Sequence, residues 1–243
     1  MTTELLVILA HPDDEFGISG TMATLAAKGQ HVVLVSATRG EVGEISNDTL
    51  ASRETLGSVR EAELRAACAV LGVTDVRFLG YRDSGMEGTP ENTDPRCLVQ
   101  AAPHAVVGRI VSLIRVLRPR NVVTFEPYGI YGHPDHIAIS RHATAAFGAA
   151  ADATQYPDAG PPWVAARLFH IALPSRVFAD WRAALEAAGE DASGLEAFES
   201  VREHSVDDLI THELDVSERT ALKYEAMLQH RTQLVVSQHE IDG

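Results

Sequence analysis

Two short segments of this chain concentrate the side chains that bind metal ions and transfer protons. Ala10 to Glu15 reads Ala-His-Pro-Asp-Asp-Glu, and His133 to His136 reads His-Pro-Asp-His, so a His-Pro-Asp triplet occurs twice. Each segment follows an apolar run, Leu5 to Leu9 for the first and Asn121 to Phe125 for the second, and precedes a helical pattern. Both are therefore expected where a strand ends, which is where open α/β sheets keep their chemistry.

Together the two segments supply a ligand set for a catalytic metal. The neutral imidazoles of His11 and His136 and the carboxylate of Asp14 form a set that suits zinc with one open coordination position. Asp13 would remain free beside the metal, where a carboxylate takes a proton from metal-bound water. Acids at a helix N-terminus also favour the helix dipole. That alternative explains the carboxylates only, and not the histidine or the repeated triplet.

The elements that position these segments alternate between strand and helix. Continuous apolar runs indicate strands buried on both faces of a parallel sheet, and the alternation predicts an α/β fold, a Rossmann-like three-layer α/β/α arrangement with a mostly parallel sheet. The predicted strands are Leu5 to Ala10, His31 to Thr38, Val76 to Leu79, Asn121 to Phe125, Ala166 to Leu173 and a short edge strand at Glu213 to Val216. The predicted helices are Ile18 to Lys28, Ser52 to Leu71, His104 to Leu117, Ile137 to Ala150, Arg176 to Ala188 and a final helix that Ser217 caps and that ends near His230.

Composition narrows the class of protein. The excess of 34 acidic over 20 basic side chains gives a net charge of −14, which opposes binding to nucleic acid or anionic lipid. Cys68 and Cys97 are predicted to be free thiols. No apolar run approaches the roughly 20 residues of a membrane span, and Met1 to Glu4 lacks the basic start of a signal peptide. We expect a cytoplasmic protein whose residues 1–243 form one domain.

The two motifs resemble those of the PIG-L/LmbE-like family of zinc-dependent deacetylases, which carry Ala-His-Pro-Asp-Asp-Glu and a later His-Pro-Asp-His. Both are intact here. The likeness extends through Thr38 to Glu41, Arg60 to Leu64, Tyr81 to Gly85 and His230 to Gln233, so it covers most of the chain. It is closest to the actinobacterial branch that acts on mycothiol and its glucosaminyl-inositol precursor.

The resemblance implies a role for each polar side chain of the motifs. Zinc, with Fe²⁺ as the alternative, is expected on His11, Asp14 and His136, with Asp13 as the general base. The other implied roles are charge stabilisation of the tetrahedral intermediate by a protonated His133, orientation of a histidine by Asp135, assistance at the oxyanion by Tyr131, and sugar hydroxyl binding by Arg60 and Asp83.

The predicted function is therefore metal-dependent removal of an N-acyl group, expected to be acetyl, from a small-molecule glucosaminyl sugar or conjugate. The irregular loop Met86 to Cys97 is expected to cover the bound sugar. An amidase acting on mycothiol S-conjugates remains an alternative. A non-haem Fe(II) oxygenase and a non-catalytic sugar-binding module are further alternatives, although no Gly-x-Gly-x-x-Gly follows the first strand.

Overall fold

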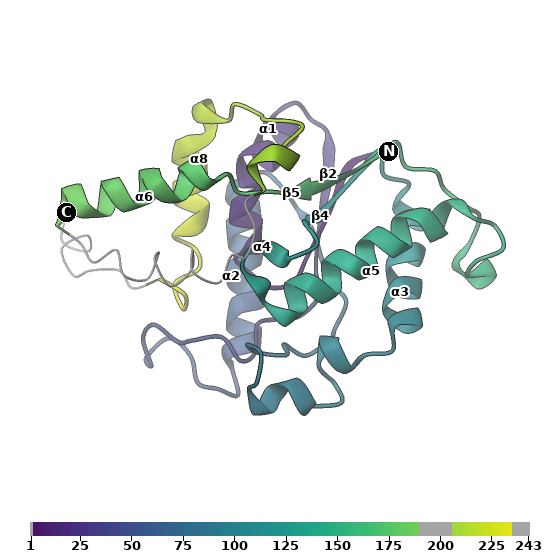
Figure 1. Ribbon diagram of the computed structural model, residues 1–243, viewed down its shortest axis with the longest axis horizontal. Helices are drawn as coiled ribbons and strands as arrows, with labels where there is room; N and C mark the ends of the chain where they lie inside the picture. Colours follow the sequence, from purple (N-terminus) through teal and green to yellow (C-terminus); the bar gives the residue numbers. More distant parts are fainter. Residues whose placement is uncertain (1, 190–205, 235–243) are drawn as a thin grey trace.

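The structure, a computed structural model, describes residues 2–189 and 206–234 and consists of three layers (Figure 1). A parallel sheet forms the middle layer. Helices α1 (Ser19–Ala27), α2 (Leu56–Val70) and α8 (Thr220–Met227) lie on one side of it, and α3 (Pro103–Leu117) and α5 (Pro134–Ala151) lie on the other. The predicted Rossmann-like α/β/α arrangement is confirmed.

The order of the strands brings the two motifs together. In the part of the chain that the structure describes, the sheet has five strands in the order β3-β2-β1-β4-β5, and every neighbouring pair is parallel. The direction of winding reverses between β1 and β4, and the carboxyl ends of strands at such a reversal are where open α/β sheets bind ligands. The strands are β1 (Thr3–Leu9), β2 (His31–Ser36), β3 (Asp75–Phe78), β4 (Asn121–Phe125) and β5 (Arg167–Ile171).

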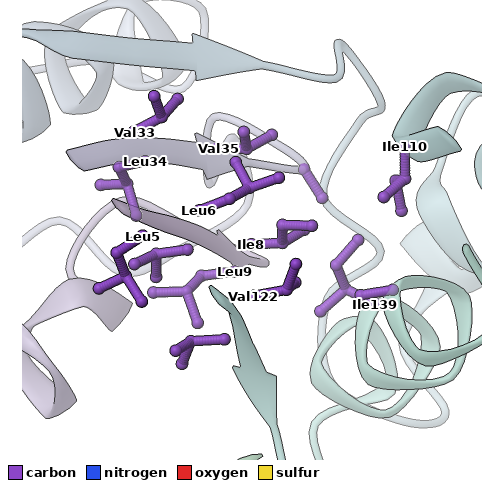
Figure 2. Packing of buried hydrophobic residues seen from close by; sticks show 14 of the residues in the cluster. Leu5, Leu6, Ile8, Leu9, Val33, Leu34, Val35, Ile110, Val122 and Ile139 are labelled. Atoms are coloured by element: carbon purple, nitrogen blue, oxygen red, sulfur yellow. The ribbon is translucent and has the colours of Figure 1, made fainter. Parts of the chain in front are cut away.

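The apolar runs of the sequence form the core that holds these strand ends in place. Leu6 and Ile8 of β1 and Val33 of β2 are completely buried, and Ile110 of α3 and Ile139 of α5 pack from the other layer (Figure 2). Burying each such side chain contributes about 1.5–3 kcal/mol. The motifs therefore follow strands that are buried on both faces, as the continuous apolar pattern predicts.

Two predictions near the C-terminal end are wrong. Glu213 to Val216 is not a strand, because no strand among residues 2–189 and 206–234 pairs with it; Val216 instead packs on α1, where a Cβ on Gly20 would lie 2.7 Å from it. Ser217 begins a 3-10 turn instead of capping a helix, and α8 starts at Thr220 without a capping side chain. The local pattern of side chains does not show whether a neighbouring strand is present to pair with a segment.

The loop Met86 to Cys97 is tied to its surroundings. The side-chain amide of Asn92 donates to the carbonyl oxygens of Ser84 (2.6 Å) and Met86 (3.2 Å), and its backbone carbonyl accepts from the side chain of Gln100 (2.8 Å). That this loop covers a substrate stays a prediction.

The remaining elements connect these layers. Helix α6 (Ser175–Ala188) extends away from the sheet at the left of Figure 1.

None of the helices in residues 2–189 and 206–234 is long and apolar enough to cross a membrane. Cys68 and Cys97 are buried free thiols, as predicted. The short elements are α4 (Gly129–Gly132), η1 (Asp14–Gly17), η2 (Pro90–Thr93), η3 (Leu98–Gln100), η4 (Pro157–Ala159), η5 (Asp207–Leu209) and η6 (Ser217–Arg219).

Candidate active site

The first motif leaves β1 in a turn that brings the side chain of Asp14 back onto the end of the strand. Its Oδ2 atom accepts hydrogen bonds from the backbone N–H groups of Ala10 (3.1 Å) and His11 (2.7 Å). Asp13 has a φ of 102°, a left-handed conformation that costs a non-glycine residue about 1–3 kcal/mol. Because of this turn, the neighbouring carboxylates of Asp13 and Asp14 have different partners.

The second motif leaves β4 in a loop built on Glu126. The Glu126 carboxylate accepts the backbone N–H groups of Tyr128 (2.7 Å) and Ile130 (2.5 Å). Ile130 has φ 69° and ψ −55°, which is rare for a β-branched residue. A Cβ on Gly129 would lie 2.5 Å from the Cβ of His136, so only glycine lets the loop pass this histidine. No local pattern in the sequence indicates the role of Glu126.

Donor atoms from the two motifs converge. The Nδ1 atom of His11 lies 3.2 Å from Nε2 of His136, which lies 3.2 Å from Oδ1 of Asp14. The distance from Nδ1 of His11 to Oδ2 of Asp14 is 3.7 Å. Ligands bonded at about 2.0–2.1 Å to a tetrahedral zinc ion are about 3.3 Å apart. The spacing of the three side chains therefore fits a metal ion of this size.

Hydrogen bonds on the far side of each ring leave the correct nitrogen free for a metal. Nε2 of His11 lies 3.2 Å from Oδ2 of Asp135, and Nδ1 of His136 lies 3.1 Å from the carbonyl oxygen of Gly129. Since these oxygens can only accept, the two nitrogens carry the ring protons. The lone pairs of His11 Nδ1 and His136 Nε2 then remain for the metal, as in carboxylate–histidine–metal triads.

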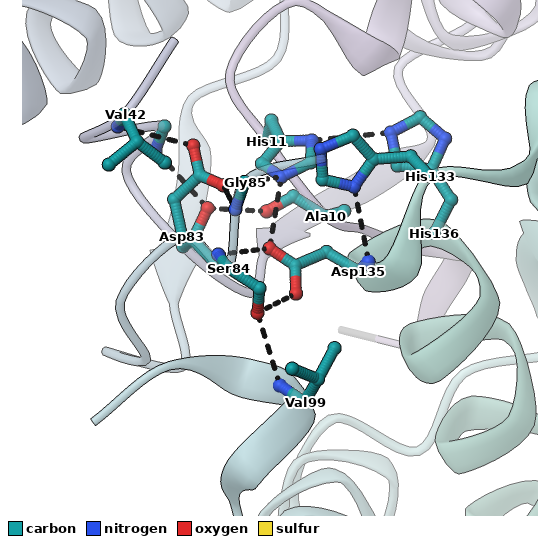
Figure 3. Close-up of polar contacts among 12 residues, drawn as sticks. Ala10, His11, Val42, Asp83, Ser84, Gly85, Val99, His133, Asp135 and His136 are labelled. Atoms are coloured by element: carbon teal, nitrogen blue, oxygen red, sulfur yellow. Dashed lines mark hydrogen bonds and ion pairs between the residues drawn. The ribbon is translucent and has the colours of Figure 1, made fainter. Parts of the chain in front are cut away.

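Asp135 is completely buried and lies where a residue that orients His11 must lie. Its Oδ2 atom also accepts the backbone N–H of Ser84 (2.9 Å), and its Oδ1 atom accepts the Ser84 hydroxyl (Figure 3). The sequence places Ser84 in a polar stretch after β3, but nothing in that stretch alone indicates that Ser84 would hold Asp135.

Asp83 belongs to the same network. Its Oδ1 atom lies 3.5 Å from Nε2 of His11 and accepts the backbone N–H of Gly85 (2.9 Å), and its Oδ2 atom accepts that of Val42 (3.3 Å). The residue is only 3% exposed. Its oxygens thus contact protein groups, and the structure associates Asp83 with His11 where the resemblance implies contact with a sugar.

Arg60 also contacts protein groups, where the resemblance implies that it binds a sugar hydroxyl. It is also 3% exposed, and its guanidinium donates to the carbonyl oxygens of Gly40 (2.9 Å) and Pro12 (2.6 Å) and to Oδ2 of Asp13 (3.0 Å). These contacts take up both of its terminal nitrogens. Arg60 therefore holds Asp13 and the turn before it. The sequence does not indicate this role, because Arg60 lies on α2, far from Asp13 along the chain.

Asp13 combines accessibility with a weakened acidity. Its side chain is 38% exposed, whereas those of the three metal-ligand candidates, His11, Asp14 and His136, are 3–9% exposed. The rest of this side chain is shielded from water, which raises the pKa of Asp13 to about 6, and the nearby Arg60 charge opposes that rise. A carboxylate with this pKa is a better proton acceptor near neutral pH than an ordinary aspartate.

The charges around His11 favour a cation at the convergence point. Burial raises the pKa of Asp14, but the charges of His136 and His11 outweigh it and hold this pKa far below its usual range. Burial likewise lowers the pKa of His11, whereas hydrogen bonds to Asp135 and Asp83 raise it well above 6.5. A site that stabilises positive charge this strongly suits a divalent metal.

His133 lies against His11 and His136, and Tyr131 lies against His133 and His136. Nδ1 of His133 accepts the backbone N–H of Asp135 (3.1 Å), so Nε2 carries the ring proton. Burial, assisted by the charges of His11 and His136, lowers the pKa of His133 to about 4. The structure therefore supports a neutral N–H donor and corrects the expectation of a protonated ring. Burial also raises the pKa of Tyr131, so its hydroxyl stays protonated.

Comparison with known proteins places both motifs within a matched family. A family described as GlcNAc-PI de-N-acetylase matches residues 6–147, which contain both motifs. The 1D-myo-inositol 2-acetamido-2-deoxy-alpha-D-glucopyranoside deacetylase of Thermobifida fusca is 41% identical over 243 residues, which cover 96% of this chain and 84% of that protein.

Solved structures share the fold at lower identity. The N,N'-diacetylchitobiose deacetylase of Pyrococcus horikoshii has a TM-score of 0.68 at 20% identity and matches 99% of this chain and 75% of its own. The 4-carboxy-2-hydroxymuconate hydratase of Pseudomonas putida has a TM-score of 0.62 at 19% identity and matches 99% and 81%. Because these two enzymes catalyse different reactions, the fold alone does not decide the chemistry.

Proposed function

The chain belongs to the PIG-L family, the GlcNAc-PI de-N-acetylases, and we propose that it hydrolyses the acetamide of an N-acetylglucosaminyl-inositol. The observation that carries this proposal is the convergence of three side chains beside the carboxylate of Asp13: the nitrogens of His11 and His136 lie 3.2 Å apart, and the two oxygens of Asp14 lie 3.7 Å from His11 and 3.2 Å from His136. The choice of sugar is supported by the Thermobifida fusca relative, whose name gives that substrate.

The metal we propose is zinc, held by His11, Asp14 and His136. Fe²⁺ is the alternative, because a set of two histidines and one carboxylate accepts either ion. When bound, the metal supplies a Lewis acid that polarises the amide carbonyl and lowers the pKa of bound water to about 7.

The protein's own side chains move the protons and stabilise the developing charge. Asp13 accepts the proton of the attacking water, while Arg60 holds one of its oxygens at 3.0 Å. As water adds, the carbonyl oxygen becomes negative and receives hydrogen bonds from the neutral His133 ring and the Tyr131 hydroxyl. Each donor aimed at such an oxyanion contributes roughly 3–4 kcal/mol. Asp13 then delivers the proton to the leaving nitrogen.

A substrate panel with product mass detection tests the function. The metal-loaded chain is incubated with N-acetylglucosaminyl-inositol, N-acetylglucosamine, an N,N'-diacetylated disaccharide and a mycothiol S-conjugate, and oxygen uptake is recorded in parallel. We expect acetate and the free amine from the first compound, no oxygen uptake, loss of activity with a chelator and recovery with zinc. Absence of turnover over the whole panel would refute the proposal, and faster cleavage of the S-conjugate would favour the amidase.

Two variants separate the role of the proposed proton acceptor from the role of the proposed metal ligands. Asp13→Asn should keep the metal and lose most turnover, because the ligand set is intact and only the proton acceptor is gone. His136→Ala should lose both metal and turnover. Metal analysis of the purified variants, with kcat measured at saturating zinc, separates these outcomes. An Asp13→Asn variant as active as the wild type would remove Asp13 from the mechanism.

A further inference from the structure

The end of the described chain folds onto the first motif. After α8, residues His230 to Gln233 form a turn closed by the hydrogen bond from the Gln233 N–H to the His230 carbonyl (2.9 Å), and we call this segment the C-terminal turn. Thr232 donates to Glu63 of α2 from its backbone N–H (2.8 Å) and its hydroxyl (2.7 Å). The Ser46 N–H donates to the carbonyl of Thr232 (2.8 Å). The C-terminal turn is thus bound both to α2 and to the loop after β2.

From this turn, the His230 ring reaches Glu15 of the first motif. The Nε2 atom of His230 lies 2.6 Å from Oε1 of Glu15, and the two side chains are 4% and 2% exposed. The second oxygen of Glu15, Oε2, accepts the backbone N–H of Asp13 at 3.0 Å. Glu15 therefore links the C-terminal turn directly to the backbone of the proposed base.

This link falls at the point where the backbone is strained. A residue other than glycine leaves a φ of 102° unless its surroundings oppose the change. Three hydrogen bonds do so at Asp13: Glu15 accepts its N–H at 3.0 Å, Arg60 donates to its side chain at 3.0 Å, and the Phe16 N–H donates to its carbonyl oxygen at 3.1 Å. Arg60 is part of the rigid helix α2, whereas Glu15 lies in a short 3-10 turn. Glu15 consequently needs a partner of its own, and His230 is that partner.

We propose that His230 is a positioning residue for the general base: through Glu15, it keeps Asp13 in the left-handed conformation from which it takes the proton. This inference rests on the proposed function. It makes catalysis depend on the contact between His230 and Glu15, although His230 is not one of the proposed metal ligands and makes no hydrogen bond to Asp13.

A matched pair of substitutions tests the link. In His230→Gln the amide nitrogen can occupy the place of Nε2 and still reach Glu15, whereas the amide of His230→Asn is too short. We expect His230→Asn to lower kcat about tenfold to a hundredfold, the cost typical of a misplaced catalytic group, with KM within about twofold and zinc content unchanged. His230→Gln should recover most of the lost kcat.

Thr232→Val is the control for general loosening of the C-terminal turn, because it removes a hydrogen bond to Glu63 and leaves Glu15 untouched. It should lower the melting temperature and change kcat little. Equal kcat values for the Asn and Gln variants, or a loss in Thr232→Val as large as in His230→Asn, would overturn the proposal.

Hydrogen exchange separates this proposal from the proposed function. The Asp13 amide, held by Glu15, should exchange slowly in the metal-free wild type and in His230→Gln, and about tenfold faster in His230→Asn. This measurement needs no substrate, so it remains decisive if the whole substrate panel fails. Unchanged exchange in His230→Asn would show that His230 does not hold Asp13 through Glu15.

Discussion

Asp135→Asn tests whether a buried carboxylate tunes the metal through His11. Asp135 accepts hydrogen bonds from the Ser84 N–H (2.9 Å) and hydroxyl, and its Oδ2 lies 3.2 Å from Nε2 of His11. In the asparagine variant the amide oxygen can take the position of Oδ2 and keep its two partners. The amide nitrogen then faces the Ser84 hydroxyl, which already accepts the Val99 N–H (3.1 Å) and can accept from the amide as well, so that only the hydroxyl proton loses its acceptor. The substitution therefore preserves shape and most of the hydrogen bonds and removes one charge.

The expected loss of metal affinity follows from the effect of this charge on His11. The carboxylate keeps the proton on Nε2 of His11 and makes Nδ1 a stronger donor, and loss of such a partner costs about 10–100-fold in metal affinity. This corresponds to roughly 1.4–2.7 kcal/mol. Asp135 also raises the pKa of His11, so the metal-free variant should be less stable as well, and its unfolding is measured separately from zinc affinity.

Competition with a chromogenic chelator measures the zinc Kd of wild type and Asp135→Asn, and thermal unfolding of the metal-free proteins checks the fold. Ser84→Ala is the control, since it disturbs packing around Asp135 and keeps its charge; its loss of affinity should be the smaller one. A zinc Kd for Asp135→Asn within about twofold of the wild type, with the fold intact, would refute tuning of His11 by this charge.

Three further predictions concern other parts of the structure. Gly129→Ala should lose most metal binding in metal analysis, because its φ is 71° and the new Cβ would lie 2.5 Å from that of His136. Arg115→Met should lower the free energy of unfolding in denaturant by about 3 kcal/mol or more and leave kcat unchanged. Arg115 is buried and donates only to carbonyl oxygens, at Ala149, Ala150, Asp152, Gln155, Tyr156 and Gly160. Burial lowers the pKa of His230, but Glu15 outweighs it and raises that pKa above 6.5. The stabilisation is then complete below about pH 6.5 and lost as pH rises through the raised pKa, so the melting temperatures of metal-free wild type and His230→Gln should converge as pH rises through that pKa.

Much of this structure is readable from the sequence because its signals are local. The apolar runs of β1, β2 and β4 are continuous, and the predicted bounds of β4, Asn121 to Phe125, are those observed. Parallel strands bring their carboxyl ends to one edge, so the meeting of His11 and His136 follows from topology. The strand predicted at Glu213 to Val216 fails because a strand needs a neighbour, and four residues say nothing about where one lies.

The contacts that give the acidic residues of the site different environments come from distant parts of the chain. The spacing of residues in the sequence does not reveal these contacts. Asp13, Asp14 and Glu15 form an uninterrupted acidic run, yet each has a different environment. Asp14 is bound by the amides of the turn and faces His136, whereas Asp13 remains accessible beside Arg60, 47 residues away. Glu15 is buried against His230, 215 residues away. Because the backbone at Asp13 is left-handed, the three acidic side chains point in different directions. One strained residue, held by Arg60 of α2 and by Glu15, thus gives three similar side chains three distinct environments.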